Sequence, residues 1–159
     1  MGTNRKIVNL EEGLILIQQW KADGQQVVFT NGCFDILHLG HLDYLEKSRQ
    51  QGDRLVIGLN TDDSVSRLKG PGRPINPEHA RARMLAALEF VDLVIAFSED
   101  TPKRLIEQVK PDILVKGKDY SIENIVGADF VLANGGEVKT IDLIEGFSTT
   151  DLINKIKRH

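Results

Sequence analysis

Short apolar runs recur along the chain between polar, turn-forming segments, and these runs predict strands. They are rich in Val, Ile, Leu and Phe, and a length of about four to eight residues is typical of a buried strand. The runs occupy residues 26–30, 54–59, 92–97, 112–116 and 138–141. The sequence therefore predicts five strands.

Amphipathic segments with helical spacing separate these runs. The capping-box pattern at Asn9–Glu12 and the apolar stripe after it predict a helix over residues 10–22. In the last predicted helix, Leu152, Ile153 and Ile156 are expected to face inward. The other predicted helices cover residues 40–51, 62–68, 80–90, 102–109 and 127–134, and the last one starts at Ser148 or Thr149.

The alternation of strands and helices predicts an α/β fold. Parallel strands joined by helices need right-handed crossovers, which place helices on both faces of the sheet. We expect a Rossmann-like, doubly wound, five-stranded parallel sheet. The 159 residues fit a single domain, with residues 1–24 as an N-terminal helix and lead-in and residues 25–159 as the α/β core.

Composition and charge narrow the functional classes. A net charge of −3, with 41% hydrophobic and 27% charged residues, is typical of a globular protein and gives no global attraction for nucleic acid. The longest apolar run, Leu14–Ile17, is far shorter than the ~20 residues of a membrane span. Cys33 is the only cysteine, which excludes an internal disulfide and fits a reducing compartment. We expect a cytoplasmic protein with neither membrane nor nucleic acid as partner.

The segment from Thr30 to His41 joins the first predicted strand to the next helix and carries the most unusual pattern. The first N–H groups of a helix have no internal partner and carry the positive end of its dipole, so they attract anions. His38 and His41 would lie on one side of the first turn, and Gly40 would let a phosphate approach the backbone. The alternative for an H-x-G-H pattern is one surface histidine and one core histidine.

Other polar segments follow the remaining strands. They are Asn60–Asp63, Lys116–Tyr120 and Glu145–Thr150. Because parallel sheets bind ligands beyond the carboxyl ends of their strands, these segments are expected to meet the H-x-G-H segment in one site. Ser148–Thr150 would add hydroxyl donors at a second helix start, or would act as an ordinary helix cap.

Residues 68–77 combine glycines, prolines and the cations Lys69 and Arg73, which predicts a mobile flap over residues 69–76 that closes on a polyphosphate. A plain surface loop is the alternative. Arg81 and Arg83 start the following helix, where cations are disfavoured, so at least one of them is expected to have a ligand or an acidic partner.

The sequence shows no covalent nucleophile. Cys33 has no basic neighbour in sequence to lower the pKa of its thiol, which favours a small residue beside a ligand over a reactive group. Redox-dinucleotide and P-loop patterns are also missing. Nucleotidyl transfer needs no nucleophile from the protein, because a substrate phosphate can attack directly once it is aligned and the developing charge is stabilised.

These motifs resemble a known superfamily. The segments Gly32–Asp35, His38–His41, Lys69–Gly70, Arg73–Pro74, Lys116–Tyr120 and Glu145–Thr150 are similar to those of the H-x-G-H nucleotidyltransferases, in their cytidylyltransferase-like family. Within that family, the chain resembles the D-glycero-β-D-manno-heptose 1-phosphate adenylyltransferases. The similar segments are Phe29–Gly32, Gly70–Pro77, Glu99–Pro102, Val115–Tyr120 and Ala133–Val138. The resemblance implies that the chain is one nucleotidyltransferase domain, making ADP-heptose and pyrophosphate from ATP and heptose 1-phosphate by direct in-line transfer for the lipopolysaccharide core.

The resemblance also implies roles for individual residues. The expected catalytic residues are His38, His41 and Lys69. The expected nucleotide-binding residues are Cys33, Phe34, His38, Gly40, His41, Lys69, Gly117, Asp119, Gly146, Ser148 and Thr149, and the expected sugar-phosphate-binding residues are Asn31, Asp35, Asp62, Arg73 and Arg81. Mg²⁺ is expected to arrive with ATP, without metal ligands of the chain's own. A homo-oligomer, dimer or tetramer, is expected.

Three alternatives remain open. The chain has Leu143 where the related glycerol-phosphate cytidylyltransferases carry an arginine before Glu-Gly-Ile/Val-Ser-Thr, which counts against CTP but leaves a cytidylyltransferase or another small-molecule nucleotidyltransferase as an alternative. A non-catalytic nucleotide-binding module is the second. A fragment of a class I tRNA synthetase is the third, and the short chain without a basic surplus argues against it.

Overall fold

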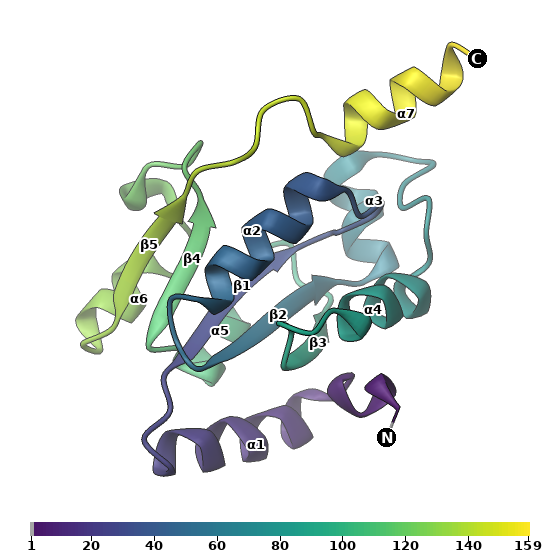
Figure 1. Cartoon of the computed structure of the whole chain (residues 1–159). Coiled ribbons are helices and arrows are strands. Elements are labelled where there is room, and N and C mark those ends of the chain that lie inside the picture. The colour runs from purple at the N-terminus through teal and green to yellow at the C-terminus, as the bar shows by residue number, and fades with distance from the viewer. Residues whose placement is uncertain (1) are drawn as a thin grey trace.

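Five parallel strands form the centre of the molecule in the computed structural model, which describes residues 2–159 (Figure 1). The strands are β1 (Val27–Gly32), β2 (Arg54–Asn60), β3 (Leu93–Phe97), β4 (Ile113–Gly117) and β5 (Glu137–Ile141). The helices are α1 (Leu10–Ala22), α2 (Leu39–Arg49), α3 (Asp62–Lys69), α4 (Glu78–Ala87), α5 (Lys103–Val109), α6 (Ala128–Ala133) and α7 (Thr149–Lys157), with short 3₁₀ helices η1 (Thr3–Lys6) and η2 (Ile122–Asn124).

The strand order is β3-β2-β1-β4-β5, with every pairing parallel. The chain first builds β1, β2 and β3 outward in one direction and then returns to the other side of β1 for β4 and β5. This order confirms the predicted Rossmann-like, doubly wound sheet. It also places the switch point, where ligands bind in such sheets, between β1 and β4.

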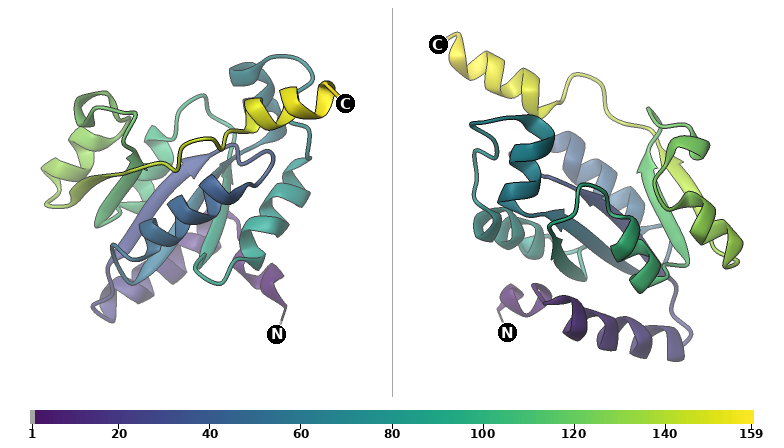
Figure 2. Two further views of the ribbon diagram at one scale, coloured as in Figure 1. Left: turned by 45° about the horizontal axis from the view of Figure 1, so that its top comes forward. Right: turned by 180° about the vertical axis from the view of Figure 1, so that it is seen from behind.

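Helices cover both faces of the sheet, as Figures 1 and 2 show, and an apolar core lies between the sheet and each helical layer. Leu45 of α2 and Leu85 of α4 pack with strand residues on one face. Ile17 of α1, Ile106 of α5 and Val131 of α6 pack on the other. Both faces of β1, β2, β3 and β4 are therefore largely buried, which explains why their sequences read as apolar runs, whereas the edge strand β5 is only partly buried.

The local signals in the sequence set most element boundaries. Helix α1 has the predicted bounds, and its Asn9–Glu12 capping box is formed on both sides. The remaining helices and strands differ from their predicted bounds by a few residues at their ends. Helix α4 begins at Glu78 and ends at Ala87, because Leu88 turns to an extended conformation that leads Val91 into the core.

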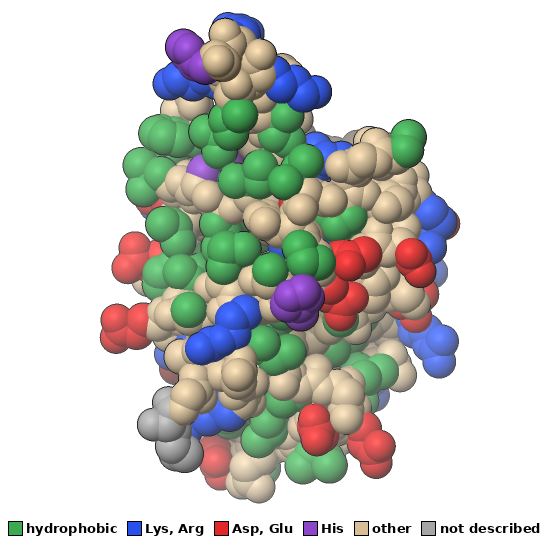
Figure 3. Space-filling view, turned by 90° about the vertical axis from the view of Figure 1, so that its right-hand side faces the viewer, with side chains coloured by type: hydrophobic (Ala, Val, Ile, Leu, Met, Phe, Trp, Pro, Cys, Tyr) green, Lys and Arg blue, Asp and Glu red, His purple; other side chains and the backbone are tan. Residues whose placement is uncertain are grey.

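Helix α7 differs from its prediction. It contains no buried residue, and Ile156 is 64% exposed while Leu152 and Ile153 are half-buried. Figure 1 shows α7 projecting from the body after a long connection from β5, and Figure 3 shows hydrophobic side chains gathered below its basic tip. The prediction that all three apolar side chains face inward is wrong for Ile156, because the connection holds only the start of α7 at the sheet edge.

None of the helices between residues 2 and 159 combines the length and apolar character needed to cross a bilayer. The single-domain assignment and the homo-oligomer stay predictions.

The contrast between two isoleucines tests the packing of α7. Ile17→Ala is expected to cost about 2–5 kcal/mol of unfolding free energy, because Ile17 is 1% exposed and its removal leaves a cavity. Ile156→Ala is expected to change it by less than about 0.5 kcal/mol, as is usual at the surface. Urea unfolding of both variants measures this, and an equal loss in both would mean that α7 packs on the body in solution.

Candidate active site

A cavity of about 660 Å³ opens at the carboxyl ends of β1 and β4. Most of the predicted site residues line it, which confirms that the polar segments after the separate strands meet in one place. These residues are Asn31, Cys33, Phe34, Asp35, His38, Gly40, His41, Lys69, Arg73, Gly117, Asp119, Ser148 and Thr149. Asp62, Arg81 and Gly146 are not among the lining residues.

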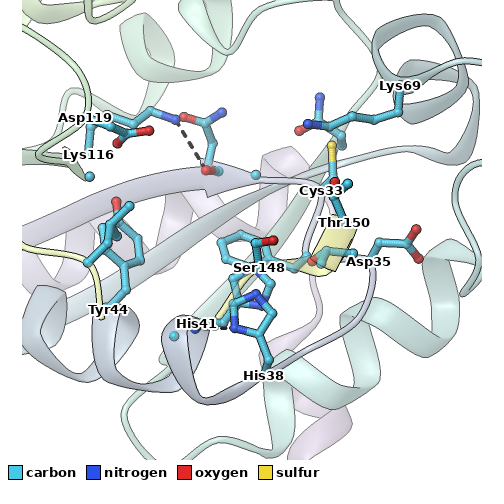
Figure 4. Close-up of a pocket in the computed structure, with 18 of the residues that line it drawn as sticks. Cys33, Asp35, His38, His41, Tyr44, Lys69, Lys116, Asp119, Ser148 and Thr150 are labelled. Carbon is cyan, nitrogen blue, oxygen red and sulfur yellow. Dashed lines mark hydrogen bonds between the residues drawn. The ribbon is translucent and has the colours of Figure 1, made fainter. Parts of the chain in front are cut away.

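His38 and His41 form the start of α2 at the base of the cavity (Figure 4). The His38 side chain caps the helix, since its Nδ1 accepts the His41 backbone N–H at 3.4 Å. Because Nδ1 is the acceptor, a neutral His38 carries its proton on Nε2, which leaves an N–H donor for a ligand. The two imidazoles stack with their centroids 3.8 Å apart, and Phe34 meets His41 edge-on at 5.4 Å.

Gly40 is required for a reason that differs from the one predicted. A Cβ on Gly40 would lie 2.9 Å from Cε1 of His38 and 3.3 Å from Cβ of Phe147. The missing side chain therefore makes room for the capping imidazole itself. Close approach of a phosphate to the Gly40 backbone stays a prediction.

Both histidines are neutral at pH 7 in this arrangement. Burial lowers the pKa of His41 to about 4, with a further contribution from His38, while the backbone of Ile36 opposes the shift. Burial also lowers the pKa of His38. His41 Nδ1 is buried and has no hydrogen-bond partner among residues 2–159. The pair therefore offers N–H dipoles rather than two positive charges, and two stacked imidazolium ions would repel each other.

The second helix start, that of α7, faces the same cavity. Ser148 caps α7 by accepting the Asp151 N–H at 3.0 Å, so its hydroxyl proton is available to a ligand. The Thr149 hydroxyl donates to the Ile36 carbonyl at 3.5 Å and joins α7 to the loop before α2. Gly146 sits just before this start with a φ of 84°, so its role is the turn rather than a lining contact.

The loop after β4 forms another wall. A Cβ on Gly117 would lie 2.6 Å from Oδ1 of Asp119, so glycine leaves space for that carboxylate beside the cavity. Cys33, across the cavity, is half-buried, and burial raises the pKa of its thiol despite the nearby cations Lys69, Arg81 and Arg73. A neutral thiol favours the interpretation of Cys33 as a small residue beside a ligand.

Asp35 holds the loop before α4. Its carboxylate accepts the backbone N–H of Ile75 and Asn76 at 2.8 Å and the Nε–H of Arg73 at 2.7 Å. Burial alone would raise the pKa of Asp35, but these donors together hold it below its ordinary value. The carboxylate is therefore committed to the protein and not open to a sugar phosphate, which corrects its predicted role.

These hydrogen bonds to Asp35, which we call the Asp35 clasp, restrain the second half of the predicted flap over residues 69–76. Arg73, Ile75 and Asn76 are fixed to Asp35, whereas Gly70 and Gly72 have φ values of 96° and 86° and form the turn between. Lys69 ends α3 and makes no ion pair within the described part of the chain. Its side chain reaches the cavity from the side opposite Lys116 (Figure 4).

Arg81 has a structural role that the sequence did not reveal. Its guanidinium is fully buried and donates to the carbonyl groups of Cys33, Asn60 and Asn76 at 2.8, 2.8 and 2.9 Å. It also pairs with Asp62 at 2.8 Å. Of the two expected outcomes for the cations of this helix, the acidic partner is therefore realised. The full burial of Arg81 corrects its predicted sugar-phosphate contact, whereas that of Asp62 stays a prediction.

Tyr44 and Lys116 are two polar members of the cavity lining that the predicted set of site residues did not include. Tyr44 lies one turn after His41, and its hydroxyl bonds the Thr30 hydroxyl at 2.8 Å and the Val115 carbonyl at 3.1 Å. Lys116 occupies the end of β4. Both had a signal in the sequence, because Tyr44 falls on the helix face of His41 and Lys116 is a cation at the end of an apolar run.

Comparison with known proteins gives a family for this site. A family model described as cytidylyltransferase-like matches residues 29–154. The chain is 56% identical over 157 residues to the bifunctional protein HldE of Azotobacter vinelandii, a match that covers 99% of the chain and 33% of that protein. The chain thus spans about a third of the length of the curated relatives it matches.

Solved structures agree with this result. A lipopolysaccharide core biosynthesis protein from Thermoplasma volcanium is 33% identical, with a TM-score of 0.60, over 76% of this chain and 98% of that one. Pantoate-β-alanine ligase from Francisella tularensis is 17% identical, with a TM-score of 0.64, over 96% of this chain and 78% of that one. At that identity the second likeness supports the fold alone.

The clasp can be tested by amide hydrogen exchange. Asp35→Ala is expected to speed exchange of the Ile75 and Asn76 amides by at least about tenfold, or ~1.4 kcal/mol, because both lose a charged acceptor. Since the pKa of Asp35 is lowered by folding, the clasp is complete above the unfolded pKa and is lost as pH falls through the folded value. Asp63→Ala serves as the control, and unchanged exchange in Asp35→Ala would refute the clasp.

Proposed function

The chain belongs to the cytidylyltransferase-like family and is a nucleotidyltransferase, and on this premise we propose that it converts ATP and D-glycero-β-D-manno-heptose 1-phosphate into ADP-heptose and pyrophosphate. The observation that carries the proposal is the cavity at the β1–β4 switch point, where the starts of α2 and α7 meet. Two helix N-termini facing one cavity suit a ligand with several phosphate groups.

The reaction would be a direct displacement. An oxygen of the sugar phosphate attacks the α-phosphorus of ATP, and the bond between that phosphorus and the oxygen bridging to the β-phosphate breaks. Pyrophosphate leaves with the electron pair. The neutral Cys33 thiol argues against a covalent enzyme intermediate, so alignment and charge stabilisation remain as the protein's contribution.

The histidine pair would stabilise the charge that develops on the phosphate oxygens. His38 has its Nε2–H to donate because Nδ1 caps the helix, and the backbone N–H groups of the α2 start add a positive potential. Ser148 and Thr149 would hold the remaining nucleotide phosphates. Lys69 and Arg73 would meet anionic groups on the other side, and Asn31 has a buried Oδ1 without a partner among residues 2–159 that suits a substrate hydroxyl.

Three considerations support ATP and a heptose phosphate as the substrates. The motifs of residues 70–77 and 115–120 resemble heptose 1-phosphate adenylyltransferases. The solved relative that is 33% identical is named as a lipopolysaccharide core biosynthesis protein, which is the context we propose for this chain. Leu143 replaces a cation of the cytidylyltransferases and itself lines the cavity. CTP is the natural competitor, because the family takes its name from cytidylyl transfer.

Mg²⁺ would enter on the triphosphate as part of the substrate. No group of three or more His, Cys, Asp or Glu side chains suited to a metal ion gathers within residues 2–159. Asp35 is committed to its clasp. The ion would then neutralise the leaving pyrophosphate without ligands supplied by a protein cage.

A substrate matrix tests the proposed function. Pyrophosphate release is expected from ATP only when heptose 1-phosphate is present, with CTP and glycerol phosphate as competing substrates. Faster turnover with the competing pair would replace the proposal by cytidylyl transfer. Binding of ATP without pyrophosphate release from any pair would favour the non-catalytic module.

The role of His41 has a separate test. A donor matched to charge developing at phosphorus alters kcat, whereas one that only holds ATP alters KM. His41→Ala is expected to lose at least ~10²-fold in kcat, about 3 kcal/mol, and to keep ATP affinity within about tenfold, ~1.4 kcal/mol.

His79→Ala is the matched control, because His79 is exposed and lies outside the cavity lining. Single-turnover rates and thermal melts on the same samples separate the possibilities. A lowered melting temperature with activity reduced only in proportion to unfolded protein would identify His41 as a core histidine.

A further inference from the structure

Lys116 stands at the seam between the two halves of the sheet. It lies near the end of β4, and its ammonium reaches across to β1, where it donates to the Asn31 carbonyl at 3.4 Å. Figure 4 shows the Lys116 side chain beside Asp119, on the side of the cavity opposite Lys69. The lysine therefore approaches the cavity from a direction that no other cation of the site covers.

The ammonium of Lys116 is poorly satisfied by the protein. An ammonium has three N–H donors, and the Asn31 carbonyl, at a long distance, takes one. The centroid of the Tyr120 ring lies 5.8 Å from the ammonium nitrogen. Within residues 2–159, Lys116 and Asp119 do not come within the 4.0 Å of an ion pair. Burial lowers the pKa of Lys116 to about 8, although Asp119 and Cys33 oppose the shift. A desolvated cation in this state favours an anionic partner.

Arg81, Arg73 and Lys118 differ from Lys116 in this respect, whereas Lys69, which also lacks an ion pair among residues 2–159, is exposed to water. Arg81 donates to three carbonyl groups and a carboxylate, and Arg73 is paired with Asp35. Lys118, two residues after Lys116, points to solvent and pairs with Asp142 at 3.0 Å. A desolvated ammonium without an anionic partner lowers the stability of the folded protein. A ligand that supplies the missing anion explains why a lysine occupies this position.

The seam is where the reacting atoms must meet. In a doubly wound sheet each half offers its own strand ends to a ligand, and the two halves join between β1 and β4. A transferase with two substrates brings one to each side, so the phosphorus that changes partners lies between them. Lys116 extends from one half to the other at this point, and the hydroxyls of Thr30 and Tyr44 link the same two strands, β1 and β4.

We propose that Lys116 is a further catalytic residue, whose ammonium contacts a non-bridging oxygen of the α-phosphate of ATP and stabilises the negative charge that builds there during transfer. The inference rests on the proposed nucleotidyl transfer and adds a named group to it. Lys69, on the opposite side, would then serve the phosphates of the leaving group. The bond changes are those of the direct displacement, and Lys116 donates a hydrogen bond without giving up its proton.

Lys116→Met tests this contact, because methionine nearly matches the length of the side chain and removes its charge. In the presence of Mg²⁺, ATP and heptose 1-phosphate, kcat is expected to fall by ~10²-fold or more. The affinity for ATP alone, measured by calorimetry, is expected to stay within about tenfold. The melting temperature is expected to remain equal or to rise, since an apolar group replaces a desolvated cation.

Two further variants sharpen the result. Lys118→Met removes a lysine two residues away that lies outside the cavity and is expected to keep wild-type kcat. Lys116→Arg retains the charge in a bulkier, planar form and is expected to recover part of the rate lost in Lys116→Met. If Lys116→Met does not fold, the Lys116→Arg rate and the pH profile of the wild type still decide the matter.

The pH profile gives a readout that a purely structural lysine would not move. The ammonium is lost as pH rises through its pKa of about 8, so kcat/KM of the wild type is expected to decline above that pH. The titratable groups near Lys116 are Asp119 and Tyr120 from its own loop and Cys33 after β1, and Tyr44 of α2 lies near Asp119 and Tyr120. In Lys116→Met the decline near pH 8 is expected to disappear.

The outcomes separate this inference from the proposed function. If the wild type turns over and Lys116→Met keeps its kcat and its alkaline decline, the role of Lys116 is refuted while nucleotidyl transfer stands. A loss confined to ATP affinity would make Lys116 a ground-state binding residue and would also overturn the proposal. A wild type that releases no pyrophosphate from any substrate pair would refute the proposed function itself.

Discussion

The buried guanidinium of Arg81 is the interaction on which the rim of the cavity depends. Three carbonyl groups, from Cys33 after β1, Asn60 at the end of β2 and Asn76 before α4, accept its N–H donors, and Asp62 balances its charge. Loop backbone near a sheet edge has unsatisfied carbonyl groups that cannot remain buried without partners. One side chain satisfies three of them at once and so fixes the relative positions of three loops.

A second constraint acts within that rim. Asp35 follows the strained turn at Phe34, whose φ of 46° lies in the left-handed region, and its carboxylate gathers donors from the loop that Arg81 also holds. Arg81 and Asp35 thus bind the same segment from two sides. The carboxylate of Asp35 and the guanidinium of Arg81 both serve the protein. In the proposed function the ligand contacts therefore fall to Lys69, Arg73, Lys116, Asn31, the imidazoles and the two helix starts.

The electrostatics of the cavity differ from those of the molecule as a whole. The chain carries a net charge of −3, whereas in the cavity Lys69, Arg73 and Lys116 equal Asp35, Asp100 and Asp119 in number, and the starts of α2 and α7 add positive potential. The histidines contribute neutral donors because burial and their mutual stacking disfavour protonation. Under the proposed function, such a local site on an acidic protein would attract small anionic substrates without a general affinity for polyanions.

How much of this was readable in the sequence depends on the range of the forces involved. Helix α1 and its capping box and the five strands follow from residues within a few positions of one another, so the sequence alone determined them. The gathering of the H-x-G-H segment and Ser148–Thr149 in one cavity followed as well, because parallel strands share one carboxyl edge.

Partners that are distant in sequence could be decided only by the tertiary structure. Arg81 meets Cys33 across 48 positions, Arg73 meets Asp35 across 38, and Lys116 meets Asn31 across 85. A charged residue in a motif has the same appearance in sequence whether it faces a substrate or a carbonyl group of the protein. Burial and hydrogen-bond geometry make that distinction, and both arise from how the loops pack at the sheet edge. The same holds for α7, whose amphipathic pattern predicts a buried face, whereas the length and course of its connection leave much of that face in solvent.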